Sequence, residues 1–187
     1  REALLRIEPV VRVAREARRV LLRRGDRIRL AKLETNVGNL YHKLDDLERA
    51  LARYERAAKL LEPDGSSLDR ARLNHNLANI LTSLGRRREA EALYVGAQET
   101  FATEGEHVLA AQTRYGIACL RFLTGEYAAA VTALEEVRLE LRRLGARPLL
   151  ALADLDLAEA LLALRLYPEA LALAENAHRW FRMRSVP

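Results

Sequence analysis

Regularly spaced asparagines are the residues of this sequence with the clearest capacity for recognition chemistry. Asn36 and Asn39 recur 40 residues later as Asn76 and Asn79. A side-chain amide carries a donor and an acceptor, so it can hold an extended peptide backbone through paired hydrogen bonds, and a nearby Lys or Arg can bind a carboxylate. These residue types favour binding over catalysis.

Catalytic and metal-binding arrangements are not predicted. The four histidines are spread along the chain without metal-ligand spacing, and we interpret each as a surface or groove residue. They are His42, His75, His107 and His178. The single Cys119 excludes an intramolecular disulfide and a cysteine-based zinc site, and it is interpreted as a buried, unreactive thiol. No phosphate loop, nucleophile elbow or dinucleotide fingerprint is present, so we predict a non-enzyme without metal or cofactor.

Composition points to a helical protein with a modest positive charge. The 187 residues are 50% hydrophobic but only 5% aromatic, and Leu, Ala, Arg and Glu dominate, which favours helix over sheet. Since 31 basic residues stand among 26 acidic ones, the net charge is +5. The near-balanced charge argues against nucleic-acid binding, which stays an alternative through an Arg-rich edge. That edge comprises Arg12, Arg15, Arg18, Arg19, Arg23, Arg24 and Arg86-Arg87-Arg88.

The cellular location is predicted from the same composition. No apolar run reaches the length of a transmembrane helix, so no membrane association is expected. A lone cysteine fits a reducing compartment, and the chain begins without signal-peptide features. We therefore expect a cytoplasmic protein. The chain also begins without an initiator methionine, and we interpret it as a fragment of a larger protein.

Small residues recur at a fixed interval of 40 residues along the chain. The recurring residues are Gly25, Gly65, Gly105 and Gly145, together with Ala50, Ala90, Ala130 and Ala170. A fixed interval over a whole chain indicates a tandem repeat, in which each copy packs on its neighbours. We divide the chain into a partial repeat at 1–30 and full repeats at 31–70, 71–110, 111–150 and 151–187.

Each repeat is predicted to form two helices. In the second repeat Leu73, Leu77 and Ile80 recur in steps of four and three, as one face of a helix does, and Gly85 ends that helix because glycine accepts a left-handed conformation. Pro9 is expected to begin the first helix, where its missing N–H has no partner. The predicted helices are 9–24, 28–43, 47–61, 68–83, 87–103, 108–123, 127–143, 148–163 and 167–183.

The repeats resemble the tetratricopeptide repeat, whose pattern places a small residue after a leucine, then aromatic residues and two alanines at fixed offsets. The matching residues are Val37-Gly38, Tyr41, Ala50, Tyr54 and Ala57; Leu77-Ala78, Leu81, Ala90, Tyr94 and Ala97; Ile117-Ala118, Tyr127 and Ala130; and Leu157-Ala158, Tyr167, Ala170 and Ala177. The resemblance implies a single all-α solenoid over 1–187, a right-handed superhelix of about four helical hairpins with a leading helix.

The period of 40 departs from the family's usual length of about 34 residues. Repeats of this longer kind are similar to arrays in large bacterial proteins, some linked to a caspase-like CHAT protease domain and others to transcriptional or signalling regulators. The resemblance therefore implies a bacterial, non-catalytic scaffold that binds a protein or peptide. An alternative is a regulatory module that restrains an attached protease or DNA-binding effector. In either case the partner can be another domain of the same polypeptide.

In the resembled family the first helix of each repeat lines a concave binding face. The positions that match give the candidate partner-binding residues Lys32, Thr35, Asn39, His42, Lys43, Arg72, His75, Asn79, Tyr115, Cys119 and Phe122. The first two repeats contribute donors and cations, and the later ones aromatic and aliphatic residues. Such a face suits a peptide with an acidic end and an apolar end, although the apolar half could instead dock a terminal helix or a neighbouring domain.

Two further expectations concern individual positions. Asn36 and Asn76 match common family residues and are interpreted as structural, whereas Asn39 and Asn79 match positions that chaperone-binding members use in a carboxylate clamp. The clamp is incomplete here because Tyr115 and Cys119 replace its basic residues, so chaperone-tail binding is not predicted. The aromatic cluster at the end of the last helix predicts an adhesive C-terminal face that can support self-association. Its residues are Trp180, Phe181 and Met183.

Overall fold

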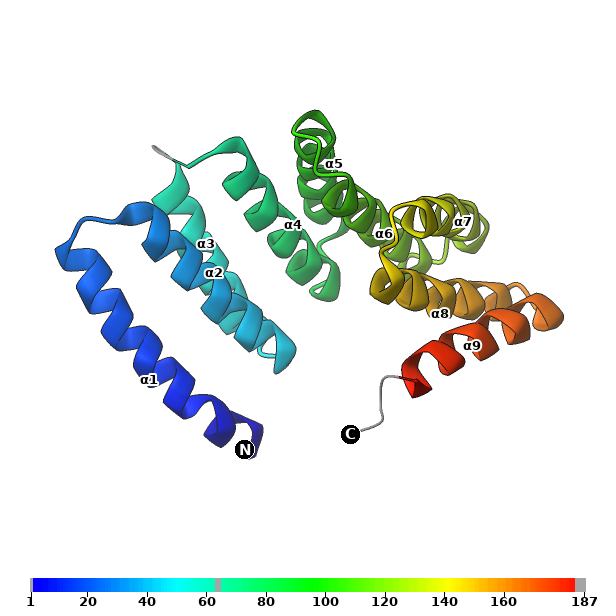
Figure 1. Cartoon of the computed structure of the whole chain (residues 1–187), viewed down its shortest axis with the longest axis horizontal. Coiled ribbons are helices and arrows are strands. Elements are labelled where there is room, and N and C mark those ends of the chain that lie inside the picture. The colour runs from blue at the N-terminus through cyan, green and yellow to red at the C-terminus, as the bar shows by residue number, and fades with distance from the viewer. Residues whose placement is uncertain (1, 63–64, 184–187) are drawn as a thin grey trace. The chain divides into compact units, whose positions relative to one another are not determined.

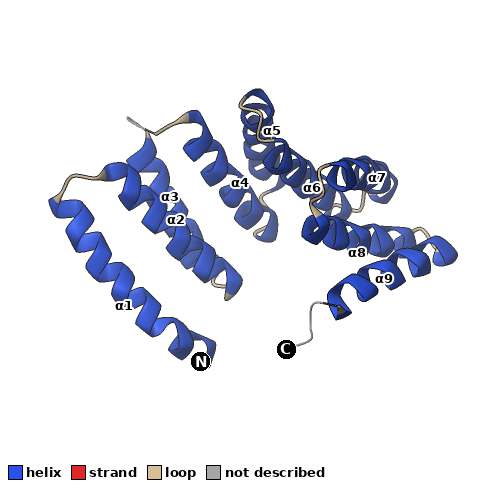
Figure 2. Cartoon of the chain, viewed as in Figure 1, coloured by secondary structure: helices blue, strands red, loops and turns tan. Residues whose placement is uncertain are grey.

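The computed structural model describes residues 2–62 and 65–183, and all its regular secondary structure is α-helical (Figures 1 and 2). The helices are α1 (Glu2–Arg23), α2 (Arg27–Lys43), α3 (Leu47–Leu61), α4 (Ser67–Ser83), α5 (Arg87–Thr103), α6 (His107–Leu123), α7 (Tyr127–Arg143), α8 (Arg147–Ala163) and α9 (Tyr167–Arg182). Successive helices form hairpins, so the fold is an all-α helical-hairpin repeat solenoid, as predicted.

The start of the first helix is the one helix boundary that the sequence misplaced by more than a residue. α1 begins at Glu2, and Pro9 lies inside it. The expectation that Pro9 begins the helix is therefore wrong. Proline removes one backbone N–H and crowds the preceding turn, but the segment before it consists mainly of strong helix formers such as Ala3, Leu4 and Leu5. Their preference extends the helix past the proline.

Seven of the turns between successive helices contain a residue in the left-handed conformation, and these residues lie 20 or 40 residues apart. Five glycines have φ between 65° and 80°, namely Gly25, Gly85, Gly105, Gly125 and Gly145. Asp45 and Arg165 stand at two further positions of this series and also have positive φ, 58° and 63°. Asp tolerates this conformation better than most residues with a Cβ, whereas Arg165 is strained by it. The repeat geometry therefore imposes the turn even where no glycine is present.

The chain divides into two compact units, Arg1–Thr100 and Phe101–Pro187, here called the N-terminal unit and the C-terminal unit. In the N-terminal unit α2 packs against both α3 and α4, and the core includes Ala50, Tyr54 and Ile80 with no exposed area. Tyr54 packs on Gly38, where a Cβ atom would lie only 2.5 Å from Cε1 of the ring. A small residue at position 38 is thus required for the hairpin to close.

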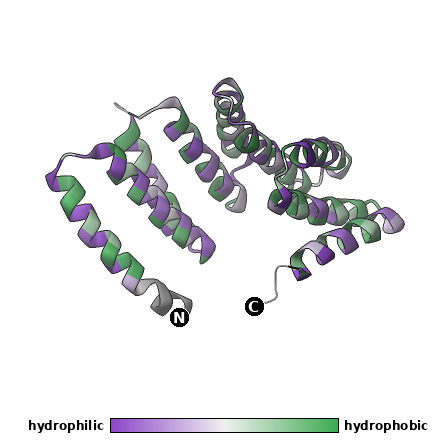
Figure 3. Ribbon diagram, viewed as in Figure 1, coloured by the Kyte–Doolittle hydropathy of each residue, from purple (hydrophilic) through white to green (hydrophobic). Residues whose placement is uncertain are grey.

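The C-terminal unit repeats the same packing. Helix α6 contacts α7 and α8, and α8 contacts α9. Ala130, Leu134 and Leu157 are buried, as are the equivalent alanines of the other repeats. Figure 3 shows the alternation of hydrophobic and hydrophilic residues along the helices of both units. None of the described helices combines the length and apolar character needed to span a membrane.

A buried carboxylate joins the first three helices. Glu34 of α2 has a side chain only 3% exposed, and its two oxygens accept from Arg18 Nε of α1 at 3.0 Å and from Arg53 Nη1 of α3 at 2.9 Å. Three repeats later, Asp154 and Arg138 occupy the positions of Glu34 and Arg18 and form the corresponding ion pair. Arg18, a member of the Arg-rich edge, therefore has a structural role in joining α1 to α2.

Candidate functional site

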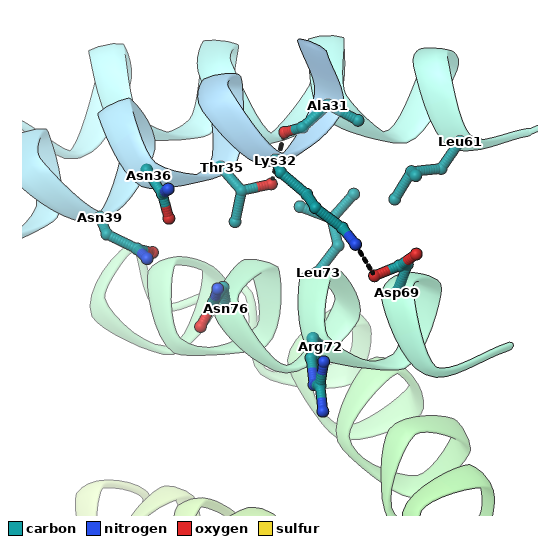
Figure 4. Close-up of a pocket in the computed structure, with 10 residues that line it drawn as sticks. All are labelled: Ala31, Lys32, Thr35, Asn36, Asn39, Leu61, Asp69, Arg72, Leu73 and Asn76. Carbon is teal, nitrogen blue, oxygen red and sulfur yellow. Dashed lines mark hydrogen bonds and ion pairs between the residues drawn. The ribbon is translucent and has the colours of Figure 1, made fainter. Parts of the chain in front are cut away.

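A pocket of about 360 Å³ lies between α2 and α4 in the N-terminal unit, and we call it the α2–α4 pocket (Figure 4). It is lined by Ala31, Lys32, Thr35, Asn36, Asn39, Leu61, Asp69, Arg72, Leu73 and Asn76. Asn36 and Asn76 occupy the same position in successive repeats, so the repeat itself places two side-chain amides on facing helices. Ala31, Leu61 and Leu73 supply an apolar surface beside them.

One end of the α2–α4 pocket is bridged by an ion pair. Lys32 Nζ lies 3.2 Å from Asp69 Oδ1, which joins α2 to α4 (Figure 4). The Lys32 side chain is 57% exposed, whereas that of Asp69 is 17% exposed. Asp69 stands in the first turn of α4, whose N-cap Ser66 Oγ accepts from the Asp69 backbone N–H. The carboxylate is therefore stabilised both by Lys32 and by the positive end of the helix dipole.

Asn39 and Asn79 hold buried tyrosines. Tyr54 Oη donates to Asn39 Oδ1 at 2.6 Å, and Tyr94 Oη donates to Asn79 Oδ1 at the same distance. Tyr54 is fully buried and Tyr94 is 2% exposed, so each asparagine satisfies a hydroxyl that water does not reach. Burial raises the pKa of Tyr54 to about 12. The amide oxygens of Asn39 and Asn79 are thus each engaged within the fold by a tyrosine hydroxyl.

The interpretation of Asn36 and Asn76 as purely structural is correspondingly revised. Both side chains line the α2–α4 pocket, together with Asn39, and Asn36 is exposed (Figure 4). A signal in the sequence could have separated the two asparagine pairs. Tyr54 follows Asn39 by 15 residues and Tyr94 follows Asn79 by 15, which places each tyrosine one helix later at the same height. Asn36 and Asn76 have no tyrosine at that spacing.

The candidate histidines differ in exposure. His75 is only 9% exposed and packs edge-on against Tyr94, with ring centroids 5.7 Å apart. The interpretation of His75 as a surface or groove residue is therefore wrong, and burial lowers its pKa to about 4. His42 is half-buried; burial lowers its pKa, and the charge of Asp45 opposes that shift. Lys43 beside it is exposed.

Two of the three candidates of the C-terminal unit, Tyr115 and Cys119, lie beside a carboxylate of α8. Tyr115 Oη and Cys119 Sγ, both on α6, donate to Asp156 Oδ2, the thiol at a distance of 3.2 Å. Burial, with the neighbouring Asp156, raises the pKa of the Cys119 thiol far above its usual range. This direction agrees with an unreactive thiol, because the thiolate is the nucleophilic form. Phe122 packs against Tyr127 with ring centroids 5.5 Å apart.

The structure thus brings some of the candidate residues together and leaves others apart. Lys32, Thr35, Asn39 and Arg72 share the α2–α4 pocket with Asn36 and Asn76, which the family pattern indicates as structural residues, and with Asp69, which the sequence does not single out. His42, Lys43, His75 and Asn79 do not line it. Tyr115 and Cys119 form the separate cluster with Asp156 in the C-terminal unit.

The Arg-rich edge and the aromatic residues at the end of α9 are the other candidate binding surfaces. Arg86 of the Arg-rich edge pairs with Glu89 at 2.7 Å, so part of its charge is compensated. Trp180 and Phe181 of the expected apolar cluster pack edge-to-face with centroids 4.9 Å apart, and Met183 is 76% exposed. The role of this cluster in self-association stays a prediction. Within the described residues, no three His, Cys, Asp or Glu side chains are placed to share a metal ion.

Two models of known protein families match parts of this chain. Residues 69–138 match the family model described as tetratricopeptide repeat, and residues 6–94 match the model of the soluble NSF attachment protein. No curated protein sequence gives a significant match. The two matched segments overlap and extend from residue 6 to residue 138, which covers the α2–α4 pocket.

Several solved structures share the fold at low sequence identity. BtubC (BKLC) from P. vanneervenii is 22% identical with a TM-score of 0.68, over 84% of this chain and 66% of that one. A Rap protein complexed with competence and sporulation factor is 16% identical with a TM-score of 0.76, over 83% and 44%. Aspartyl phosphate phosphatase F from Bacillus subtilis is 14% identical with a TM-score of 0.80, over 93% and 46%. The chain therefore spans two thirds or less of these proteins, and the likeness concerns the fold.

Proposed function

We propose, on the premise that the chain is a tetratricopeptide-repeat protein, that it is a non-catalytic interaction scaffold whose α2–α4 pocket holds an extended segment of a partner protein. The observation that carries the proposal is the pair Asn36 and Asn76, which line one pocket from equivalent positions of successive repeats. A side-chain amide matches the donor and acceptor of a peptide group, so two amides on facing helices can hold two points of an extended backbone.

The pocket supports specificity as well as backbone binding. Ala31, Leu61 and Leu73 are each at most 3% exposed and form the apolar floor of the pocket, on which a small aliphatic group of the segment would rest. The N–H groups of Asn39 add a donor, since its oxygen is occupied by Tyr54. We assign no direct contact to Asn79 or His75, because the former holds Tyr94 and the latter is buried.

The C-terminal unit offers a second contact surface of different character. Phe122 and Tyr127 pack together at the end of α6, and Leu123 beside them is 65% exposed. With Tyr115 and Cys119 on the same helix, we propose that this surface binds an apolar segment, either of the same partner or of a neighbouring domain. The single solenoid over 1–187 and the cytoplasmic location remain parts of this proposal.

A regulatory version of the scaffold is the second candidate. Two of the solved structures with this fold are a Rap protein complexed with competence and sporulation factor and a Rap conjugation gene regulator in complex with the Phr* peptide. These complexes support the proposal that a repeat array of this fold can couple peptide binding to the control of an effector. In this chain the effector would be an attached protease or DNA-binding domain, released when the pocket is filled.

Nucleic-acid binding through the Arg-rich edge is the third candidate and is less well supported. Arg86 is paired with Glu89, and Arg18 is paired with the buried Glu34. Each pair reduces the charge available to phosphates. Nucleic-acid affinity that falls steeply with salt would support this candidate, because neutralised phosphates release counterions.

The scaffold proposal is tested by selecting binders from a displayed library of random peptides of about ten residues, which rise roughly 3.3 Å per residue when extended. The best selected peptide is then titrated against the unaltered chain and the double variant Asn36→Ala/Asn76→Ala. Loss of two paired amide contacts should weaken binding at least about tenfold, since each hydrogen bond contributes about 0.5–1.5 kcal/mol.

Asn74→Ala is the matched control, because it removes an amide from the same helix α4 outside the pocket. Its affinity should stay within about twofold of the unaltered chain. Equal losses in the control and the double variant would indicate general damage to α4. An unchanged affinity in the double variant would show that the selected peptide does not use the pocket, and the proposal would fail.

A further inference from the structure

We infer that Lys32 gives the α2–α4 pocket a preference for an acidic ligand and that Asp69 competes with that ligand: Asp69 holds Lys32 in the free protein, and an acidic side chain of the ligand replaces Asp69 on binding. The inference rests on the proposed function and names the chemistry of the segment that the pocket accepts. It starts from the ion pair between Lys32 Nζ and Asp69 Oδ1, 3.2 Å apart, which bridges α2 and α4 at one end of the pocket (Figure 4).

The charges that line the pocket favour an anion. Lys32 and Arg72 are cations, and Asp69 is the single carboxylate among the described lining residues. Both cations are exposed, whereas the Asp69 side chain is only 17% exposed. A cationic ligand would have to compete with Lys32 for a carboxylate that lies deeper than its partner. An anionic ligand meets Lys32 at the surface, where the long side chain can turn toward it.

The exchange is feasible because Asp69 does not depend on Lys32 alone. It occupies the first turn of α4, where the helix N-terminus stabilises a negative charge. When Lys32 turns to a ligand carboxylate, Asp69 keeps this interaction and its partial access to water. The exposed pair itself is weak, because solvent screens it and ordering two side chains is costly. A charge-assisted hydrogen bond from Lys32 to the ligand can therefore replace it.

The neighbouring groups define the rest of the ligand. The apolar surface of Leu61 and Leu73 lies beside Lys32, and the amides of Asn36 and Asn76 line the same pocket. An extended segment with an acidic residue next to an aliphatic one fits this arrangement. Lys32 then provides the preference for an acidic residue, and Asp69 lowers the affinity of acidic segments because its ion pair with Lys32 must first be broken. A segment without an acidic residue leaves the bridge in place.

The test uses the selected peptides and three variants of the whole chain. Asp69→Asn removes the competing charge and should tighten binding of acidic peptides by between about 1.5-fold and 5-fold. Lys32→Gln should weaken the same peptides and abolish the preference for acidic residues in a repeated selection. Peptides in which the acidic residue is replaced by its amide should bind Asp69→Asn and the unaltered chain equally.

Glu89→Gln is the matched control. Glu89 stands in the first turn of α5 as Asp69 does in α4, and it is paired with Arg86 at 2.7 Å, but it does not line the pocket. The substitution changes the net charge and the helix terminus in the same way as Asp69→Asn. It should leave the affinity of acidic peptides unchanged, which separates the local exchange from a general effect of charge.

The outcomes separate the two proposals. Enrichment of acidic peptides together with tighter binding by Asp69→Asn alone supports the inference. Peptides that depend on Asn36 and Asn76 but show no acidic preference, or that bind Asp69→Asn no better than Glu89→Gln, overturn the inference and leave the scaffold proposal standing. A selection that enriches no peptide dependent on the pocket overturns both.

Discussion

The buried His75 makes the stability of the N-terminal unit depend on pH. It is 9% exposed and packs on Tyr94, and burial lowers its pKa from 6.5 to about 4. A group with a depressed pKa in the folded state contributes stability above its unfolded pKa, and that stability is lost as the pH falls toward the folded value. The window for this loss therefore lies between about pH 6.5 and pH 4.

The size of the effect follows from proton linkage. Each pKa unit corresponds to about 1.36 kcal/mol, so the full contribution of His75 is about 3 kcal/mol. At about pH 5 the unfolded histidine is protonated and the folded one is not, and linkage gives about 2 kcal/mol less stability than at about pH 7.5. This value is an upper limit if the surrounding helices open partially.

His75→Leu removes the titrating group and fills its place with an apolar side chain of similar size. Leucine also stands at the equivalent position of the fourth repeat, Leu155. Urea unfolding followed by circular dichroism at both pH values gives the free energy of unfolding of each protein. The pH-dependent loss should be smaller in the variant by about 2 kcal/mol. Equal losses in the two proteins, within about 0.5 kcal/mol, would refute the claim that His75 is held neutral by burial.

Three further predictions concern stability. Asn39→Ala should cost about 1–3 kcal/mol because it leaves the buried Tyr54 hydroxyl without a partner, whereas Tyr54→Phe should cost only about 0.5–1.5 kcal/mol; equal costs in urea unfolding would contradict this asymmetry. Glu34→Gln should cost about 1–3 kcal/mol and increase hydrogen exchange in α1, because it removes a buried charge that binds two arginines; unchanged α1 exchange would argue against this role. Arg165→Gly should raise the free energy of unfolding by about 1 kcal/mol and Gly125→Ala should lower it by about as much, since both positions have positive φ. The melting temperatures should shift in opposite directions, and shifts of the same sign would be inconsistent with the turn geometry.

The sequence predicted the fold well because the signals for helices and turns are local. Leu73, Leu77 and Ile80 define one helix face without reference to any other helix, and glycines in phase mark the turns. Arg165 shows the limit of such signals. Its left-handed turn follows from the packing of α8 and α9 against each other, and its own residue type argues against that turn.

The site was predicted less well because its side chains depend on contacts between helices. The place of Asn39 and Asn79 in the repeat predicts ligand contacts, but whether an amide faces a ligand or a tyrosine depends on which side chain the next helix places opposite it. The burial of His75 depends likewise on Tyr94, which lies on α5. Asp69 carried no signal of its own, because its meaning comes from Lys32 on another helix.

The measurement that tests the central claim most directly is the dissociation constant of one selected peptide for the unaltered chain, for Asn36→Ala/Asn76→Ala and for the control Asn74→Ala. If the α2–α4 pocket holds an extended segment, the double variant should bind at least about tenfold more weakly while the control binds within about twofold of the unaltered chain. Equal affinities of all three proteins would contradict the account, because the peptide would then be bound elsewhere on the chain.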